Sequence, residues 1–201
     1  MSAPRVLVVE HQSDAGLGHF GERLIANGIQ TETVGPDAGL PVPTSLDGFD
    51  GLIVLGGSMG PMDDSVAPWL PATRELLAEG VESGIPTLGI CLGAQLLATA
   101  TGGHVRTMPE GPEIGVHGVT FNDRAITDPL FREIGGTVTP AVQWHWLEAD
   151  ELPTTARVLA SSSSCENQAF RIGERAWGVQ FHPEALGESA RAWADEDYGD
   201  L

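Results

Sequence analysis

Residues 86–100 read PTLGICLGAQLLATA, an apolar run that passes directly into a small, leucine-rich segment typical of a buried helix. The run through Ile90 predicts a strand, which places Cys91 at a strand-to-helix corner. Gly89 and Gly93 stand two residues before and after Cys91, so the backbone can turn sharply without Cβ clashes. This spacing is the cysteine version of the G-x-S-x-G nucleophile elbow. It predicts an outward-facing thiol at a helix N-terminus, whose partial positive charge favours the thiolate.

The chain on the N-terminal side of this corner alternates predicted strands and helices. Strands are predicted at 6–10, 30–34 and 52–55, and helices at 19–26 and 72–82. Alternation at this spacing indicates an α/β fold with a mostly parallel open sheet and helices on both faces. With 201 residues the chain is long enough for one sizeable core, so we expect a single domain over its whole length.

Two further segments complete the predicted fold. From about 115 to 139 the pattern changes to strands around one short helix at 129–134, which predicts a small antiparallel extension of the sheet. The acidic end of the chain, residues 195–201, predicts a frayed tail.

A second motif, Phe181-His182-Pro183-Glu184, follows a predicted strand that begins at Ala176. Functional groups in open α/β sheets gather at the carboxyl ends of strands, so we expect His182 to lie near Cys91. Glu184 can curl back to accept the proton of the imidazole and hold the other ring nitrogen toward the thiol. The two motifs together predict a Cys91-His182-Glu184 catalytic triad.

The pairing of GICLGAQ at 89–95 with GVQFHPE at 178–184 resembles the class I (triad) glutamine amidotransferases, which include the glutaminase domains of GMP synthase and carbamoyl phosphate synthetase. The resemblance extends to LGGSMG at 55–60, where the family keeps its oxyanion loop, and to QAFR at 168–171 before the last strand. Within the family the chain is most similar to the stand-alone, GMP-synthase-like amidotransferases. The resemblance implies a flavodoxin-like fold of the amidotransferase type and a single glutaminase domain.

The resemblance also implies an activity, the hydrolysis of the side-chain amide of L-glutamine. The Cys91 thiolate would form a γ-glutamyl thioester and release ammonia for a separate synthetase, after which water would release glutamate. The oxyanion of this reaction needs preorganised donors, and the backbone N–H groups of Leu92 and Gly57 are the candidates. By resemblance, the loop at Gly57 and Met59 and the side chain of Gln95 hold the glutamine. The segment around His145 matches the place where family members bind the amino-acid end.

Two departures from the family pattern keep other functions open. Leu147 stands where many relatives have an acidic residue, and Gly57-Ser58-Met59 replaces a common Gly-Gly-Pro. Leu147 and the tryptophans on either side of His145 suit a bulkier or less polar substrate, so the alternative is an autonomous hydrolase of γ-glutamyl amides other than glutamine. A non-enzymatic interaction module is a third alternative, which the intact Cys91, His182 and Glu184 argue against.

Composition excludes several other classes of function. A net charge of −18 disfavours nucleic acids and anionic membranes as partners, because the chain offers them no basic patch. All ten basic residues are arginine, which excludes a lysine Schiff base and a Walker-type phosphate loop. The histidines are scattered, so we expect neither a metal nor another cofactor. Two cysteines make no disulfide framework, Cys165 lies in a polar turn without an adjacent base, and a short apolar first strand favours a cytoplasmic protein.

Overall fold

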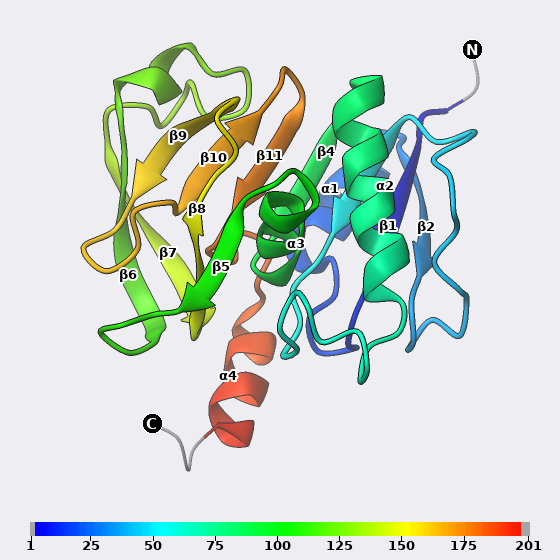
Figure 1. The fold of residues 1–201 in the computed structure, drawn as a ribbon, viewed down its shortest axis with the longest axis horizontal. Helices are drawn as coiled ribbons and strands as arrows, with labels where there is room; N and C mark the ends of the chain where they lie inside the picture. The colour runs from blue at the N-terminus through cyan, green and yellow to red at the C-terminus, as the bar shows by residue number, and fades with distance from the viewer. Residues whose placement is uncertain (1–2, 198–201) are drawn as a thin grey trace.

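A nine-stranded sheet forms the centre of the structure, a computed structural model in which residues 3–197 are described (Figure 1). The elements in chain order are β1 (Arg5–Val9), α1 (Gly18–Ala26), β2 (Gln30–Val34), β3 (Gly51–Val54), α2 (Leu70–Ser83), β4 (Thr87–Ile90), α3 (Leu92–Ala100), β5 (His104–Thr107), β6 (Glu113–Phe121), the 3₁₀ helix η1 (Asp123–Thr127), β7 (Val138–His145), β8 (Leu147–Glu151), β9 (Ala156–Ser161), β10 (Ala169–Ile172), β11 (Ala176–Val179) and α4 (Gly187–Glu196). The strand order across the sheet is β2-β1-β3-β4-β11-β10-β9-β6-β7.

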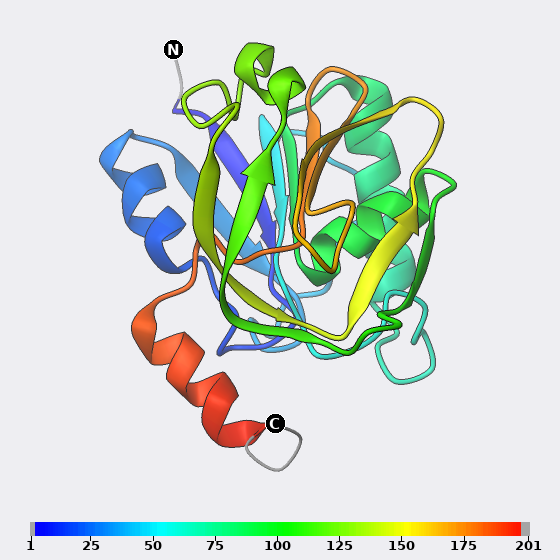
Figure 2. The ribbon, with the colours of Figure 1, turned by 90° about the vertical axis from the view of Figure 1, so that its left-hand side faces the viewer.

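The first half of this sheet is parallel, as the sequence predicts. Strands β2, β1, β3, β4 and β11 all run in one direction. Their residues alternate between two apolar layers: Leu7 and Val9 of β1 pack in the cluster that includes α2 and α3, whereas Val8 packs in the cluster on the α1 side. The helices therefore cover both faces, and the predicted α/β fold with a parallel sheet is confirmed (Figures 1 and 2).

The second half of the sheet is the antiparallel extension, built from β10, β9, β6 and β7. A separate ribbon of β5 and β8 lies beside α3. The prediction of a helix at 129–134 is wrong. This segment forms turns instead, because the buried Asp128 carboxylate accepts the Leu130 N–H at 2.9 Å and also receives the Trp177 indole N–H at 3.1 Å. The helical turn of this region is η1, which Asn122 caps by accepting the Arg124 N–H.

The C-terminal part of the chain differs from the predicted frayed tail. Asp195 and Glu196 belong to α4, and the carboxylate of Asp197 accepts the indole N–H of Trp144 at 2.7 Å. Trp193 is the buried residue of α4 and packs against Trp144, with 6.0 Å between ring centroids. These two contacts tie α4 to the body of the protein, and Figure 1 shows the helix below α3, beneath the ends of the central strands. The last part of the predicted tail, 198–201, lies outside the described residues.

Within the described residues 3–197, no helix combines the length and the apolar composition that crossing a bilayer requires.

His11, in the loop after β1, gives the fold a specific sensitivity to acid. The Trp69 indole N–H donates to its Nδ1 at 2.9 Å, and burial lowers the pKa of His11 to about 4. An unfolded histidine takes up its proton near pH 6.5, whereas folded His11 does so only near pH 4. Between these two values the unfolded state binds more protons than the folded state, so stability falls as the pH falls. We expect the unfolding free energy to fall by about 3 kcal/mol over this pH interval because of His11.

Urea unfolding of the wild type and of His11→Gln at pH 7 and pH 4 checks this expectation. The glutamine oxygen can still accept the Trp69 N–H, but it does not titrate. Between pH 7 and pH 4 the wild type should lose more unfolding free energy than His11→Gln. The control His117→Gln, at an exposed position, should lose as much as the wild type. Equal losses in the wild type and His11→Gln would contradict the assignment.

Candidate active site

Cys91 occupies the predicted corner between β4 and α3 in a strained backbone conformation. Its φ is +51°, and no other described residue except glycine has a positive φ. Such a conformation costs on the order of 1–3 kcal/mol and persists only where the surroundings impose it. A Cβ on Gly89 would collide with the backbone of Gly93, and one on Gly93 would collide with the carbonyl of Val54. The Cys91 N–H donates to Val179 O at 2.8 Å, which fastens the elbow to β11.

Three neighbouring strands bring the predicted site segments together. Strands β3, β4 and β11 are adjacent and parallel, so their carboxyl ends lie side by side. Gly56, just after β3, packs so closely that a Cβ there would lie 3.6 Å from Cys91 Cβ and 3.0 Å from His182 Cε1. The prediction that both motifs meet at the carboxyl edge of the sheet is confirmed, and the glycine is needed there to leave room for the other two residues.

His182 and Glu184 form a buried pair behind Cys91. His182 Nδ1 lies 2.7 Å from Glu184 Oε1, and the two side chains are 4% and 1% exposed. A carboxylate oxygen only accepts, so Nδ1 carries a proton and donates, and Nε2 is left for the thiol. Burial alone would lower the pKa of His182, but the negative charge of an ionised Cys91, its hydrogen bond and the Glu184 carboxylate outweigh it and raise this pKa to about 10. His182 therefore holds its proton at neutral pH.

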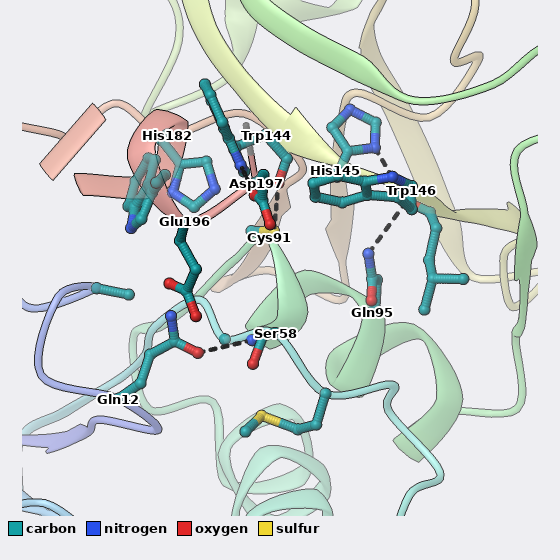
Figure 3. A pocket seen from close by; sticks show the side chains of 15 residues that line it. Gln12, Ser58, Cys91, Gln95, Trp144, His145, Trp146, His182, Glu196 and Asp197 are labelled. Atoms are coloured by element: carbon teal, nitrogen blue, oxygen red, sulfur yellow. Dashed lines mark hydrogen bonds between the residues drawn. The ribbon is translucent and has the colours of Figure 1, made fainter. Parts of the chain in front are cut away.

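A cavity of about 270 Å³ opens in front of Cys91 (Figure 3). It is lined by six of the residues predicted for the site: Gly57, Met59, Cys91, Gln95, His145 and His182. Leu92 and Glu184 do not line it, because Leu92 begins α3 with its side chain in the core and Glu184 lies behind His182. Within the described part of the chain, the backbone N–H groups of Leu92 and Gly57 have no hydrogen-bond partner. Both remain available to a ligand.

Residues 19–193 match the family described as glutamine amidotransferase class-I. The chain belongs to this family. It is 31% identical over 183 residues to the glutamine amidotransferase-like protein YfeJ of Salmonella typhimurium, with 90% of this chain and 75% of that protein covered. It is also 31% identical to one subunit of the glutamine-hydrolyzing GMP synthase of Natronomonas pharaonis, with 98% of this chain and 97% of that protein covered.

Two more comparisons bear on the amidotransferase. Gamma-glutamyl peptidase 3 of Arabidopsis thaliana is 29% identical over 152 residues, which are 74% of this chain and 59% of the peptidase. The crystal structure of a glutamine amidotransferase from Thermotoga maritima superposes with a TM-score of 0.86 and 30% identity, covering 98% of this chain and 84% of that one. The fold expected from the resemblance is thus confirmed as that of a class I glutamine amidotransferase.

Gln95, one turn into α3, has a fixed orientation in the amidotransferase. Its Nε2 donates to Leu147 O and to Gln180 Oε1, both at 3.2 Å. A backbone carbonyl only accepts, so the nitrogen must face Leu147 and the side-chain oxygen must face the other way. Both amide protons of Gln95 are used in these bonds. What the side chain can still offer a ligand is an acceptor.

His145 lines the cavity of the amidotransferase, but its ring nitrogens are already engaged. Nδ1 lies 2.9 Å from Leu147 O, and Nε2 lies 3.1 Å from both Glu113 Oε2 and Gln143 Oε1. The ring is therefore directed into the protein rather than toward a ligand. The indoles on either side of it, Trp144 and Trp146, also line the cavity.

Sequence reasoning missed several residues of the amidotransferase cavity. Trp193 and Glu196 of α4 and Asp197, which follows that helix, line it, and the ring centroid of Trp193 lies 4.7 Å from that of His182. No motif in the acidic tail signals this contact, because it depends on where the helix docks. Gln12 also lines the cavity and accepts the Ser58 N–H at 2.8 Å, which steadies the glycine loop.

The second thiol of the amidotransferase, Cys165, is in a very different environment. It is buried, and burial raises its pKa to about 12, with smaller contributions from the nearby Glu148 and Glu113 carboxylates. A thiol in this state is not a nucleophile at neutral pH. Among residues 3–197, no group of three or more His, Cys, Asp or Glu side chains is arranged to hold a metal ion.

Proposed function

We propose that this protein hydrolyses the side-chain amide of L-glutamine through a γ-glutamyl thioester on Cys91 and releases glutamate and ammonia. The observation that carries the proposal is the arrangement of the strained Cys91 beside His182, which Glu184 orients and whose pKa is raised by Cys91 and then by Glu184. A thiolate next to an imidazolium is the activated form of a cysteine nucleophile.

The reaction follows from this arrangement in two steps. The Cys91 sulfur attacks the amide carbon of glutamine, and the electron pair of the C=O bond moves to the oxygen. His182 then gives its proton to the amide nitrogen, so the C–N bond breaks, ammonia leaves and the thioester remains. In the second step His182 takes a proton from water, and the resulting hydroxide attacks the thioester carbon. The C–S bond then breaks, so that glutamate departs, its acid proton passes to ammonia, and the Cys91 thiolate beside a protonated His182 is restored.

The oxyanion formed in both steps requires donors that are free before the substrate arrives. The N–H groups of Leu92 and Gly57 meet that requirement, and Leu92 adds the positive end of the α3 dipole. Removing one such donor from an oxyanion hole costs about 3–4 kcal/mol of transition-state stabilisation. In the same proposal, Gln95 Oε1 accepts a hydrogen bond from the substrate's ammonium group, since its amide protons are occupied.

Glutamate release from L-glutamine by the purified protein tests this function. We expect steady turnover without any added protein. If turnover is absent while a glutamine-like chloroketone still labels Cys91, the glutaminase proposal survives only in a form that a partner must activate. Neither turnover nor labelling would reject L-glutamine as the substrate.

The cavity favours one second candidate, an autonomous hydrolase of bulkier γ-glutamyl amides. Three indoles line the cavity, from Trp144, Trp146 and Trp193, and flat apolar walls suit an aromatic or peptide leaving group. The similarity to gamma-glutamyl peptidase 3 points the same way. The thioester and the roles of Cys91 and His182 would be unchanged.

Comparing kcat/KM for L-glutamine, a γ-glutamyl dipeptide and a γ-glutamyl anilide separates the two candidates. A preference for glutamine favours an ammonia-producing protein that serves a separate synthetase, as the similarity to one subunit of a GMP synthase suggests. A preference of tenfold or more for the larger amides, roughly 1.4 kcal/mol of transition-state binding, would favour the autonomous hydrolase.

A further inference from the structure

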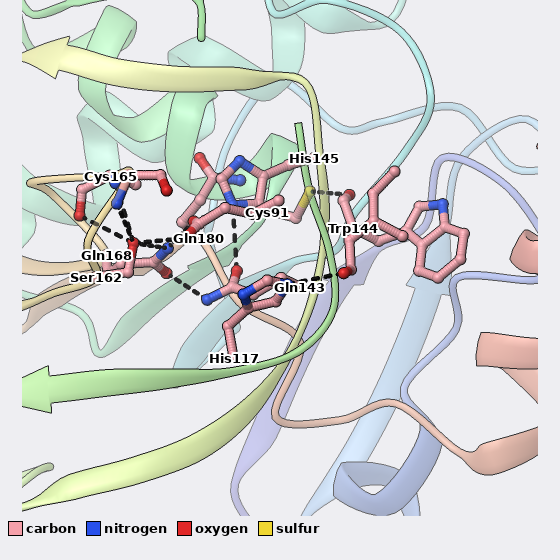
Figure 4. Close-up of polar contacts among 12 residues, drawn as sticks. Cys91, His117, Gln143, Trp144, His145, Ser162, Cys165, Gln168 and Gln180 are labelled. Carbon is pink, nitrogen blue, oxygen red and sulfur yellow. Dashed lines mark hydrogen bonds and ion pairs between the residues drawn. The ribbon is translucent and has the colours of Figure 1, made fainter. Parts of the chain in front are cut away.

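Behind the cavity lies a buried polar cluster centred on Glu113, the first residue of β6. Figure 4 shows its neighbours His145, Gln143, Ser162 and Gln168. The Glu113 side chain is 3% exposed and that of its partner His145 is 1% exposed. Three donors meet this carboxylate: Ser162 Oγ at 2.6 Å, His145 Nε2 at 3.1 Å and the amide nitrogen of Gln168 at 2.5 Å. The catalytic steps proposed above use none of these three side chains. Of the three, only His145 lines the cavity.

Hydrogen-bond chemistry determines the charge of His145. Its Nδ1 faces the carbonyl oxygen of Leu147, which can only accept. Its Nε2 faces a carboxylate oxygen of Glu113 and the side-chain oxygen of Gln143, and the nitrogen of Gln143 is already donating to Gln168 Oε1 at 3.0 Å. Both ring nitrogens therefore have acceptors as their only partners. While Glu113 is ionised, a neutral imidazole would leave one nitrogen facing an acceptor with no hydrogen between them, so the geometry favours the doubly protonated imidazolium.

The buried carboxylate is suited to balance this charge. Burial would raise the pKa of Glu113, but the hydrogen bonds from His145 and Ser162 outweigh it and lower this pKa. The other titratable groups around the pair are His117 on β6, which favours the charged carboxylate, the thiol of Cys165, which stays protonated, and the buried Glu148 carboxylate on β8, which lies against Cys165. An ion pair with both members hydrogen-bonded avoids the large cost of an isolated buried charge.

The pair is linked to Gln95 through one shared atom, the carbonyl oxygen of Leu147. His145 Nδ1 donates to this oxygen, and so does Gln95 Nε2 at 3.2 Å. The turn from Trp144 to Leu147 therefore takes its position from His145, and Gln95 takes its orientation from the turn. The turn also places Trp144 O 3.8 Å from the sulfur of Cys91.

We propose that Glu113 is a positioning residue, which keeps His145 protonated so that the imidazolium holds the Leu147 carbonyl and thereby aims Gln95 into the cavity. This inference rests on the proposed function in one respect, that Gln95 binds the substrate. Glu113 itself touches neither the cavity nor the reacting atoms. Its loss should weaken substrate binding more than the chemical step.

The test compares Glu113→Gln with Ser162→Ala. Glutamine keeps the size of Glu113 but removes the charge, whereas Ser162→Ala removes another donor to the same carboxylate and leaves the ion pair intact. Nitrogen NMR of labelled histidine in the wild type should show both ring nitrogens of His145 protonated at pH 8. In Glu113→Gln His145 should become neutral. Its hydrogen bond to Leu147 O then changes from a charge-assisted bond to a weaker neutral one, so KM should rise, by up to roughly tenfold, with a smaller change in kcat. Ser162→Ala should keep both the imidazolium and the wild-type KM.

Several outcomes would overturn the proposal. A neutral His145 in the wild type would do so without any variant, even if Glu113→Gln failed to fold. An unchanged KM in Glu113→Gln, or the same rise in KM in Ser162→Ala, would mean that the ion pair of Glu113 and His145 does not position Gln95. If the wild type does not hydrolyse glutamine, half-saturation of Cys91 labelling by a glutamine-like chloroketone replaces KM. A failure of the proposed function is then seen in the wild type, and a failure of this inference is seen only in the comparison with the variants.

Discussion

Replacing Cys91 by alanine should reduce glutamate release to the uncatalysed background, a loss on the order of 10⁴-fold or more, as for removal of the nucleophile in other covalent hydrolases. Alanine cannot form the thioester, and the other thiol of the chain, Cys165, does not line the cavity. The elbow should survive, because the Cys91 N–H and its bond to Val179 O belong to the backbone. A steady-state assay of glutamate release measures the effect.

Cys165→Ala is the matched control for this experiment. It removes the other thiol of the chain, which is buried and whose pKa of about 12 keeps it protonated. We expect wild-type turnover in Cys165→Ala. Turnover that survives in Cys91→Ala would show that Cys91 is not the nucleophile. Turnover that disappears in Cys165→Ala at unchanged thermal stability would show the same.

Replacing Glu184 by glutamine should lower kcat by roughly 10²- to 10⁴-fold, as loss of the orienting carboxylate does in other triads. The amide matches the carboxylate in size, but its nitrogen can donate to His182 Nδ1 and stabilise the tautomer with the proton on the wrong nitrogen. The carboxylate also raises the pKa of His182. Without it this pKa falls, so the variant should lose its proton donor, and hence its activity, at lower pH than the wild type.

The measurement is kcat as a function of pH for the wild type, Glu184→Gln and the control Glu188→Gln. Glu188 lies four residues further along the chain, is exposed in the first turn of α4 and does not line the cavity. It should behave like the wild type. If Glu184→Gln retained wild-type kcat and the same alkaline limb, the carboxylate would have no role in orienting His182.

The parallel half of the fold could be predicted because its signals are local. The apolar run through Ile90, the glycines around Cys91 and the helix that follows are read directly from neighbouring residues, and they agree with the structure. The helix expected at 129–134 failed for the opposite reason. Its backbone is shaped by Asp128, whose partners Arg171 and Trp177 come from strands far away in the chain.

The same distinction applies to the site. Cys91, His182 and Glu184 stand in short motifs whose spacing carries their chemistry, so the sequence could nominate them and the structure brings them together. Glu113 and Trp193 could not be nominated. Each acquires its role only when distant elements meet, β6 with β7 in one case and α4 with the end of β11 in the other. The single-domain boundary and the cytoplasmic location stay predictions.

The most direct measurement of the central claim is mass spectrometry of the protein after rapid acid quenching during turnover of L-glutamine. The proposed function predicts a γ-glutamyl group on the peptide that contains Cys91, an adduct that hydroxylamine removes and that the Cys91→Ala variant does not form. Turnover at the wild-type rate with no adduct on Cys91 at any time point, and with the same rate in Cys91→Ala, would contradict it.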